Sequence, residues 1–322
     1  MANDRAQRET TVSVVIPCYY SEKTIGKVYE LSREELLKLG YHYEFVLVND
    51  GSTDGTFDVI SEICAHDSNV RGVNFARNFG QHAAIIAGLR QVTGDLVLLM
   101  DDDMQTHPSQ FGKLLHEIEN GDWDVVFGEY PMHKEAGWRR LGSDFTLWTM
   151  RVLTKRPKDI TASNFFVMKR FVSDELIKYD GPYVYIQGLL FRATNKMTNV
   201  EVEHFDREVG SSGYTFKALV RLWSNVLNFS MVPLRAGTVI GAAIAAISFI
   251  VAIVLIVQRL INPSIQLGWS SIMVTITFFA GSILLFLGLM GEYLGRLFMM
   301  ANKAPQYVTR ASINCEKDDD EK

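Results

Sequence analysis

Two aspartates one residue apart are the residues of this chain best suited to chemistry. Asp101 and Asp103 follow the apolar run 96–100, a pattern typical of a buried strand that ends in charged residues. Because side chains alternate along a strand, the two carboxylates point the same way at its C-terminal end, where open α/β sheets bind ligands. Such a pair suits Mg²⁺ or Mn²⁺ together with a phosphate-rich ligand. The alternative is an acidic turn exposed to solvent.

The segments around these aspartates predict a mostly parallel sheet, because strand-like runs alternate with amphipathic helices. We expect strands at 11–17, 44–50, 70–75, 96–100 and 124–128, an edge strand at 161–168, and helices at 21–38, 57–65, 83–91, 109–119 and 143–153. Neither the dinucleotide-binding G-x-G-x-x-G fingerprint nor the Walker loop is present. The chain is therefore expected to contain an α/β nucleotide-binding domain of another kind.

Two further residues near strand ends could contact a nucleotide. Asp50 ends the second strand, where its carboxylate could accept hydrogen bonds from a nucleoside. Its alternative role is a helix cap, but Ser52, Thr53 and Asp54 can all supply that cap. Arg77 follows the third strand and could hold a diphosphate, although a lone arginine is more often a surface residue.

Composition excludes some classes of partner. The 322 residues carry a formal net charge of −5, so there is no basic field of the kind that binds nucleic acid. Three scattered cysteines, Cys18, Cys64 and Cys315, favour a reducing compartment over a disulfide framework. Residues 1–11 are polar and lack the apolar core of a signal peptide, so the first domain is expected in the cytoplasm.

Charge nearly vanishes after Arg235, which predicts membrane spans. Residues 236–257 and 269–290 contain no charged side chain, and each is about long enough to cross a bilayer. The intervening 258–268 is short, so the two spans form a hairpin. Arginine and lysine residues cluster outside this hairpin rather than in its loop, which places both termini in the cytoplasm. We therefore expect a multi-pass protein of the inner membrane.

Amphipathic segments flank the predicted hairpin. Residues 215–231 and 291–302 interleave aromatic and apolar residues with charges, as expected of helices at a membrane interface. Residues 312–322 are expected to be disordered. The expected domains are a cytoplasmic catalytic domain at 1–214, a juxtamembrane helix at 215–235, two transmembrane helices at 236–290, and a second juxtamembrane helix with an acidic tail at 291–322.

Several short motifs lie at the predicted strand ends. They are Val14-Val15-Ile16-Pro17, Val48-Asn49-Asp50-Gly51-Ser52-Thr53-Asp54, Arg77-Asn78-Phe79-Gly80, Gly94-Asp95 and Asp101-x-Asp103-x-Gln105. Together they resemble the pattern of glycosyltransferase family 2. A later Arg207-x-x-Gly210-x-Ser212-x-Tyr214 and the predicted hairpin make the chain similar to the polyprenyl-phosphate glycosyltransferases of that family. The resemblance covers residues 11–308.

The resemblance implies a GT-A fold, in which an α/β domain with a mostly parallel sheet binds a nucleotide sugar. It assigns Asp50 to the base, Asp101 to the ribose and sugar, and Asp103 with Gln105 to the metal, Mg²⁺ or Mn²⁺. The remaining residues expected to bind the donor are Pro17, Glu22, Arg77 and Asp102. Asp102 stands where the family usually has a small residue, and it either faces the opposite side or adjusts the charge at the metal.

The resemblance also implies a site for a lipid phosphate. The residues assigned to it are Arg139, with Arg140 as the alternative, Arg207, Ser212 and Tyr214. The alternative for the first two is a pair of surface charges at a helix start. Asp101, Asp103 and Arg207 are the expected catalytic residues. The chain departs from the family at Ile160, Phe166 and Gly213, where relatives often have aspartate, arginine and lysine.

The expected activity is metal-dependent transfer of one sugar from a nucleotide diphosphate sugar, with UDP-sugar favoured, to polyprenyl (undecaprenyl) phosphate. Cell-envelope glycan or lipid modification is the expected purpose, and the resemblance implies a homo-oligomer, with a tetramer expected. One alternative is a processive polysaccharide synthase, but residues 220–223 lack the Gln-x-x-Arg-Trp segment usual in those enzymes. The other is a non-catalytic membrane scaffold, or a partner of a lipid-sugar flippase, that retains the fold. The sequence leaves the sugar, the base, the metal and the polyprenyl chain length open.

Overall fold

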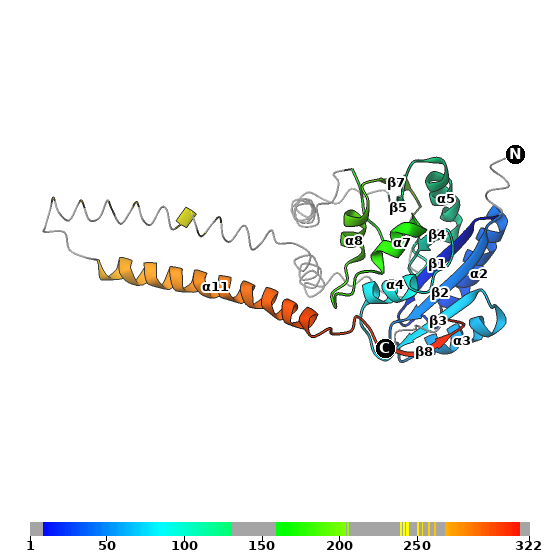
Figure 1. Ribbon diagram of the computed structural model, residues 1–322, viewed down its shortest axis with the longest axis horizontal. Helices are drawn as coiled ribbons and strands as arrows, with labels where there is room; N and C mark the ends of the chain where they lie inside the picture. The colour runs from blue at the N-terminus through cyan, green and yellow to red at the C-terminus, as the bar shows by residue number, and fades with distance from the viewer. Residues whose placement is uncertain are drawn as a thin grey trace. The chain divides into compact units, whose positions relative to one another are not determined.

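A computed structural model describes residues 9–130, 159–203 and 205, scattered positions between 239 and 261, and residues 268–315. The chain divides into two compact units, one formed by residues 1–220 with 305–322 and the other by residues 221–304. The first unit contains the sheet and its covering helices, labelled in Figure 1. The second unit contains the long helix α11.

The first unit is built on an eight-stranded sheet with the order β7-β5-β6-β4-β1-β2-β3-β8. The pairs β1–β2, β1–β4, β2–β3 and β5–β7 are parallel, whereas β6 and β8 run antiparallel to their neighbours. This arrangement confirms the expected mostly parallel sheet. The strands are β1 Thr11–Cys18, β2 His42–Asn49, β3 Val70–Phe75, β4 Leu96–Leu99, β5 Val125–Glu129, β6 Phe166–Lys169, β7 Met197–Glu201 and β8 Thr309–Ile313.

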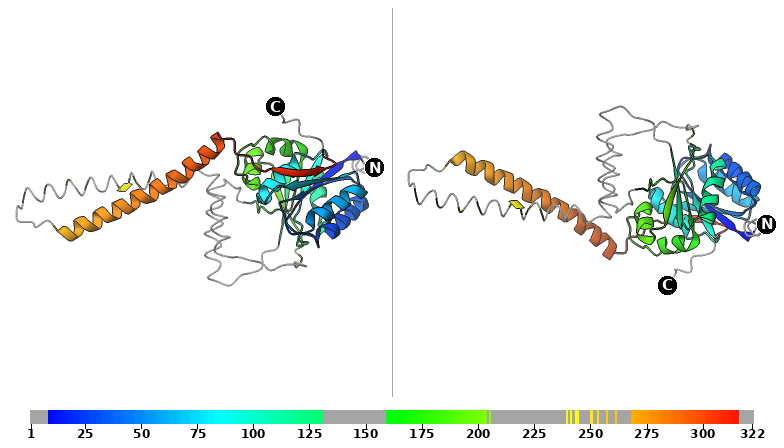
Figure 2. Two further views of the ribbon diagram at one scale, coloured as in Figure 1. Left: turned by 90° about the horizontal axis from the view of Figure 1, so that it is seen from below. Right: turned by 90° about the horizontal axis from the view of Figure 1, so that it is seen from above.

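Helices cover both faces of the sheet (Figure 2). One layer contains α2, α3 and α5, in which α2 contacts the other two, and the other contains α4, α7 and α8, in which α7 contacts both of its neighbours. The helices of this unit are α2 Ile25–Leu39, α3 Thr56–His66, α4 Gln81–Leu89, η1 Pro108–Gln110, α5 Phe111–Asn120, α7 Arg170–Leu176 and α8 Ile186–Ala193.

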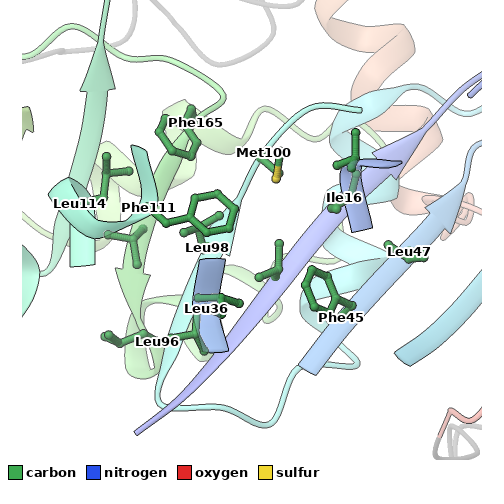
Figure 3. Close-up of a cluster of buried hydrophobic side chains, with 14 of the residues drawn as sticks. Ile16, Leu36, Phe45, Leu47, Leu96, Leu98, Met100, Phe111, Leu114 and Phe165 are labelled. Atoms are coloured by element: carbon green, nitrogen blue, oxygen red, sulfur yellow. The ribbon is translucent and has the colours of Figure 1, made fainter. Parts of the chain in front are cut away.

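The main core lies under α2, α3 and α5 and is drawn in Figure 3. Alternate residues of the central strands point into it, as the period of two requires, and Ile16, Phe45 and Leu98 are fully buried there. On the other face α4 approaches β1 closely. A Cβ atom at Gly88 would lie 2.4 Å from Val15 Cγ1, so only glycine fits at this crossing.

An ion pair between the buried Glu44 and the partly buried Arg71 lies near the amino end of β2. Arg71 Nη1 is 2.9 Å from Glu44 Oε2, and Ser13 Oγ donates to Glu44 Oε1 over 2.5 Å. The Thr93 hydroxyl and the backbone N–H groups of Thr93 and Gly94 also donate to this carboxylate. Burial acts to raise the pKa of Glu44, but these hydrogen bonds and the Arg71 charge outweigh it and hold the pKa below its usual range. The cluster joins β1, β2, β3 and the loop before β4.

Two expectations for the sheet were wrong. The segment 161–168 was expected to be an edge strand, but β6 lies inside the sheet between β5 and β4. The burial of β6 is that of an interior strand, because Phe166, Val167 and Met168 are completely buried. β7, α7 and α8 were not anticipated, because each is only five to eight residues long and offers a short pattern to recognise.

The chain after α11 returns to the first unit, which corrects the expectation of disorder from residue 312. β8 pairs antiparallel with β3, and Asn314 Nδ2 donates to the carbonyl oxygens of Cys64 and Val70, each over 2.9 Å. Just before this strand, the ring of Tyr307 stacks on Phe75 with centroids 4.9 Å apart. Residues 309–315 therefore belong to the ordered sheet domain.

In the second unit, α11 Trp269–Ala301 is a single helix of 33 residues. The expected break between a span at 269–290 and an interfacial helix at 291–302 is absent, because Gly291 and Gly295 weaken a helix without ending it as proline would. Within the described residues, Phe278–Ala301 is the one helical stretch apolar and long enough to cross a membrane. Its large apolar side chains, such as Leu284 and Leu287, are exposed, unlike those of a core helix.

The rest of the predicted membrane region stays untested. The first predicted span, 236–257, lies outside the described residues apart from scattered helical positions. The amphipathic helix expected at 215–231 and the helix expected at 143–153 also lie outside them.

Candidate active site at the carboxyl ends of β1, β2 and β4

The candidate site lies where parallel strands end together. β1 pairs with β2 on one side and with β4 on the other, so the carboxyl ends of all three meet at one edge of the sheet. β1 and β4 are the strands between which the chain order of the sheet changes direction, and α/β sheets bind ligands in the crevice at such a point. Asp50 follows β2, Tyr19 follows β1, and Asp101 follows β4 by two residues.

Asp101 is held by side-chain amides from two other elements. Gln81 Nε2, in the first turn of α4, donates to Asp101 Oδ1 over 2.5 Å, and Asn164 Nδ2 donates to Oδ2 over 3.4 Å. Burial, together with repulsion from the carboxylates of Asp103 and Asp102, raises the pKa of Asp101 to about 7. A cation beside this cluster would favour its ionised form.

Asp102 contacts the β1–α2 loop, which favours the first of the two roles left open for it. Its Oδ2 accepts a hydrogen bond from Tyr19 N at 3.2 Å and another from the Ser21 hydroxyl. Burial raises the pKa of Asp102, and these two hydrogen bonds oppose the rise. The third carboxylate therefore links the ends of β4 and β1 instead of joining Asp103.

Asp103 and Gln105 lie on a tight turn after β4. Gln105 N donates to Asp103 Oδ1 over 3.1 Å, and Met104 between them has a φ of 60°. Among the described residues, no group of three histidine, cysteine or acidic side chains could hold a metal ion by itself. The oxygen donors of this turn fit the mode in which Mg²⁺ or Mn²⁺ takes one or two carboxylates and completes its shell with substrate phosphates and water. Metal binding here stays a prediction.

Asp50 organises the neighbouring loop. It is 3% exposed, and its oxygens accept hydrogen bonds from Phe79 N at 2.7 Å, Gly80 N at 2.9 Å and Asn78 Nδ2 at 3.0 Å. Burial raises the pKa of Asp50, opposed by the two backbone donors. The expected contact with a base is untested, and the carboxylate already fixes the Arg77–Gly80 motif in place.

The other residues assigned to the donor lie around the same edge. Arg77 is exposed, with its guanidinium 4.2 Å from the centre of the Phe79 ring. Pro17 is buried in β1 opposite Val48. Glu22 Oε2 accepts a hydrogen bond from Gly55 N, at the start of α3, over 3.3 Å. None of these positions conflicts with donor binding.

Several residues of the site were missed from the sequence. The rings of Tyr19 and Tyr20 are half exposed at the end of β1 and pack edge to face with centroids 4.6 Å apart. Asn164 and Gln187, which connect to Asp101, come from segments whose elements were mispredicted or unforeseen. Of these residues, only the tyrosine pair could have been identified from the sequence, because two consecutive aromatic residues directly after a strand are well placed to contact a ligand.

The residues expected at the acceptor phosphate cannot be placed. Arg139, Arg140, Arg207, Ser212 and Tyr214 lie outside the described residues, as does Gly213. Of the other departures from the family, Phe166 is fully buried and packs against Phe127 with ring centroids 5.3 Å apart. Ile160 is also buried. These two side chains belong to the core rather than to the surface of the site.

Solved structures with the same fold confirm the GT-A architecture. Mannosyl-3-phosphoglycerate synthase from Rubrobacter xylanophilus superposes with a TM-score of 0.51 at 18% identity, covering 73% of this chain and 77% of that one. Glucosyl-3-phosphoglycerate synthase from Mycobacterium tuberculosis gives 0.50 at 19% identity, covering 70% and 83%. At this identity the likeness shows the fold alone.

Sequence relatives match over nearly the full length. The undecaprenyl-phosphate 4-deoxy-4-formamido-L-arabinose transferase of Proteus mirabilis is 30% identical over 310 residues, which is 95% of each chain. An uncharacterized glycosyltransferase of Bacillus subtilis is 28% identical over 96% of each chain. The family described as Glycosyl transferase family 2 matches residues 13–176, which include every strand-end carboxylate described above. The chain therefore belongs to glycosyl transferase family 2 and is a glycosyltransferase.

Proposed function

We propose that this glycosyltransferase moves a single sugar from a nucleotide diphosphate sugar to undecaprenyl phosphate at the cytoplasmic face of the inner membrane. One observation carries the proposal: strand-end carboxylates meet at the β1–β4 crevice of a chain that also has an exposed apolar helix of membrane-spanning length. The Proteus mirabilis relative, which matches over 95% of its length, is an undecaprenyl-phosphate transferase by name, and this supports the lipid acceptor. The product would serve cell-envelope glycan or lipid modification.

The donor is expected to lie across the ends of β2, β1 and β4. Asp50 and its loop bind the nucleoside, Arg77 the diphosphate, and Asp101 the ribose and sugar. A UDP-sugar is the favoured donor. The sugar in the name of the Proteus mirabilis relative, 4-deoxy-4-formamido-L-arabinose, is the first candidate for the transferred group.

The reaction needs positioning more than acid–base chemistry. An oxygen of the lipid phosphate, already ionised near neutral pH, attacks the anomeric carbon. The bond from that carbon to the diphosphate breaks, and the nucleoside diphosphate leaves with the electron pair, which inverts the anomeric centre. Asp103 and Gln105 would hold Mg²⁺ or Mn²⁺, and such an ion would neutralise the charge of the leaving diphosphate. Orientation and charge neutralisation therefore supply most of the rate.

The acceptor and membrane assignments rest on the sequence. Arg139, or Arg140 in its place, and Arg207 hold the lipid phosphate through planar guanidinium groups, assisted by Ser212 and Tyr214. Residues 236–257 pair with α11 as a membrane hairpin, with the catalytic domain and both termini in the cytoplasm. The working assembly is a homo-oligomer, with a tetramer expected.

The test is transfer of label from radioactive UDP- and GDP-sugars, including the formamido-arabinose donor, into an organic-extractable lipid. Purified full-length protein is incubated with undecaprenyl phosphate and Mg²⁺ or Mn²⁺, and EDTA is the control. Label that enters the lipid with one donor and stops with EDTA supports the proposal. Neither transfer nor metal-dependent donor hydrolysis with any donor would contradict it and favour the non-catalytic scaffold.

A further inference from the structure

A chain of two side-chain amides extends from Asp101 to α8. Asn164 Nδ2 donates to Asp101 Oδ2 over 3.4 Å, and Gln187 Nε2 donates to Asn164 Oδ1 over 2.9 Å. Asn164 lies in the loop before β6, and Gln187 lies in the first turn of α8. The chain thus connects the end of β4 to a helix that follows it by almost ninety residues.

These hydrogen bonds fix which way each amide points. Because the Asp101 carboxylate accepts, Asn164 presents its NH₂ group to it and turns its oxygen toward Gln187. Gln187 must then present its own NH₂ group to Asn164. Its oxygen, Oε1, is left pointing elsewhere, and this buried atom has no hydrogen-bond partner among the described residues. The whole residue is 8% exposed.

A second unpaired atom lies on a neighbouring helix. His82 follows Gln81 in the first turn of α4, and its ring packs edge to face on Tyr185, the residue before α8, with centroids 5.4 Å apart. Its Nδ1 is likewise buried without a partner in the described part of the chain. Leaving a buried polar atom unpaired is costly, so each such atom needs an explanation, such as a water molecule or a ligand group that completes its hydrogen bonds.

The chemistry of Oε1 limits what it can bind. An amide oxygen only accepts hydrogen bonds, so it needs a donor. The phosphates of the donor substrate and of the lipid are ionised and offer no such donor at neutral pH. The nucleoside is assigned to Asp50, at the end of β2. A sugar carries hydroxyl groups, or an N–H group when it bears an amide, and it is assigned to Asp101 itself.

We propose that Gln187 binds the sugar of the donor: its Oε1 accepts a hydrogen bond from a hydroxyl or amide N–H group of that sugar. Asn164 is a positioning residue, because it orients Gln187 without touching the sugar through its own oxygen. The inference rests on the proposed function, and it adds a residue that determines which sugar is accepted.

The test separates the sugar from the nucleotide. Full-length protein is titrated calorimetrically, in the presence of Mn²⁺, with UDP, UDP-glucose and UDP-linked 4-deoxy-4-formamido-L-arabinose. In Gln187→Leu the dissociation constant of the tighter-binding UDP-sugar should rise about tenfold, the effect expected for one lost hydrogen bond in a buried site, while that of UDP changes less than about twofold. Asn164→Ala should weaken UDP-sugar binding in the same way, and it should also weaken UDP somewhat, because it removes a hydrogen bond from Asp101, which is assigned to the ribose as well.

Ser173→Ala is the matched control. Ser173 Oγ is also buried and unpaired among the described residues, but it lies on α7, outside the amide chain. The variant should bind all three ligands as the wild type does. Should the leucine variant not fold, Gln187→Asn withdraws the oxygen by one methylene and is expected to show the same selective loss.

Three outcomes would overturn the inference. Equal weakening of UDP and the UDP-sugars would give Gln187 a structural role only. Unchanged binding of every ligand, in a variant with normal thermal unfolding, would mean that the residue does not contact the sugar. Wild-type protein that binds neither UDP nor either sugar would overturn the proposed UDP-sugar activity as well, so the two failures are distinguishable.

Discussion

Replacing Asp102 should weaken donor binding without changing the metal requirement. Its Oδ2 accepts from Tyr19 N and from the hydroxyl of Ser21, a residue that is 2% exposed. In Asp102→Ala the buried Ser21 hydroxyl loses this partner, which costs about 1–3 kcal/mol. The loop that carries Tyr19 and Tyr20 is then no longer held against β4. We expect the KM for the nucleotide sugar to rise about tenfold, the kinetic equivalent of about 1.4 kcal/mol.

Asp102→Asn tests whether the hydrogen bonds of this side chain or its negative charge matter for donor binding. The asparagine oxygen can still accept from both donors, and the variant removes a carboxylate whose raised pKa indicates that its charged form is disfavoured in the fold. It should therefore keep a KM near that of the wild type and a thermal midpoint at least as high. Asp103→Asn is the contrast, because loss of a metal ligand should abolish transfer in a folded protein.

The assay is transfer to undecaprenyl phosphate, with donor and Mn²⁺ concentrations varied independently for each variant. Ser21→Ala combined with Asp102→Ala completes a double-mutant cycle, and the second change should add little to the first. If Asp102→Asn raises the Mn²⁺ concentration needed for half-maximal activity, as a metal ligand would, the role inferred from the two hydrogen bonds is wrong.

Three further predictions concern the free energy of unfolding, which is measured by urea denaturation of the purified variants. Glu44→Leu should cost about 3–5 kcal/mol, because the partly buried Arg71 loses its carboxylate partner and several buried donors lose their acceptor. Since the folded-state pKa of Glu44 is depressed, its contribution is complete above the unfolded pKa and is lost as the pH falls through the folded pKa, so wild type and variant should converge in acid. Gly88→Ala should cost about 1–3 kcal/mol, because its Cβ would meet Val15; full stability would contradict that contact. Deleting 309–322 should lower stability and promote aggregation by exposing the edge of β3, whereas deleting 316–322 should do neither.

The central sheet could be predicted from the sequence because each of its parallel strands is marked by a pattern of neighbouring residues. In the parallel strands, β-branched runs such as 11–16 are buried on both faces, and charged residues follow where each strand ends. The same rule placed Asp50 and Asp101 at one edge. The sequence left two roles open for Asp102, because β4 ends at Leu99 and strand alternation does not extend to the three aspartates; its contact with the β1–α2 loop is visible only in the fold.

The missed elements depend on contacts between distant segments. Residues 309–313 read Thr-Arg-Ala-Ser-Ile, which has little apolar pattern, and they form a strand by pairing with β3 more than two hundred residues earlier. Similarly, nothing in the sequence near Gln187 indicates that its amide will meet Asn164. Lone amides carry no spacing signature, so only the fold reveals them.

The three consecutive aspartates are best understood through what each one contacts. Three carboxylates this close repel one another, and burial raises the pKa of both Asp101 and Asp102. The arrangement persists because each of these two accepts hydrogen bonds from a different part of the fold: Asp102 from the β1–α2 loop, and Asp101 from the amides of α4 and the loop before β6. Asp103 is thereby left at the turn where a cation and a diphosphate would relieve the remaining repulsion. On this reasoning the repulsion that remains among the carboxylates would favour a cation here, and we expect the metal-bound donor of the proposed function to supply it.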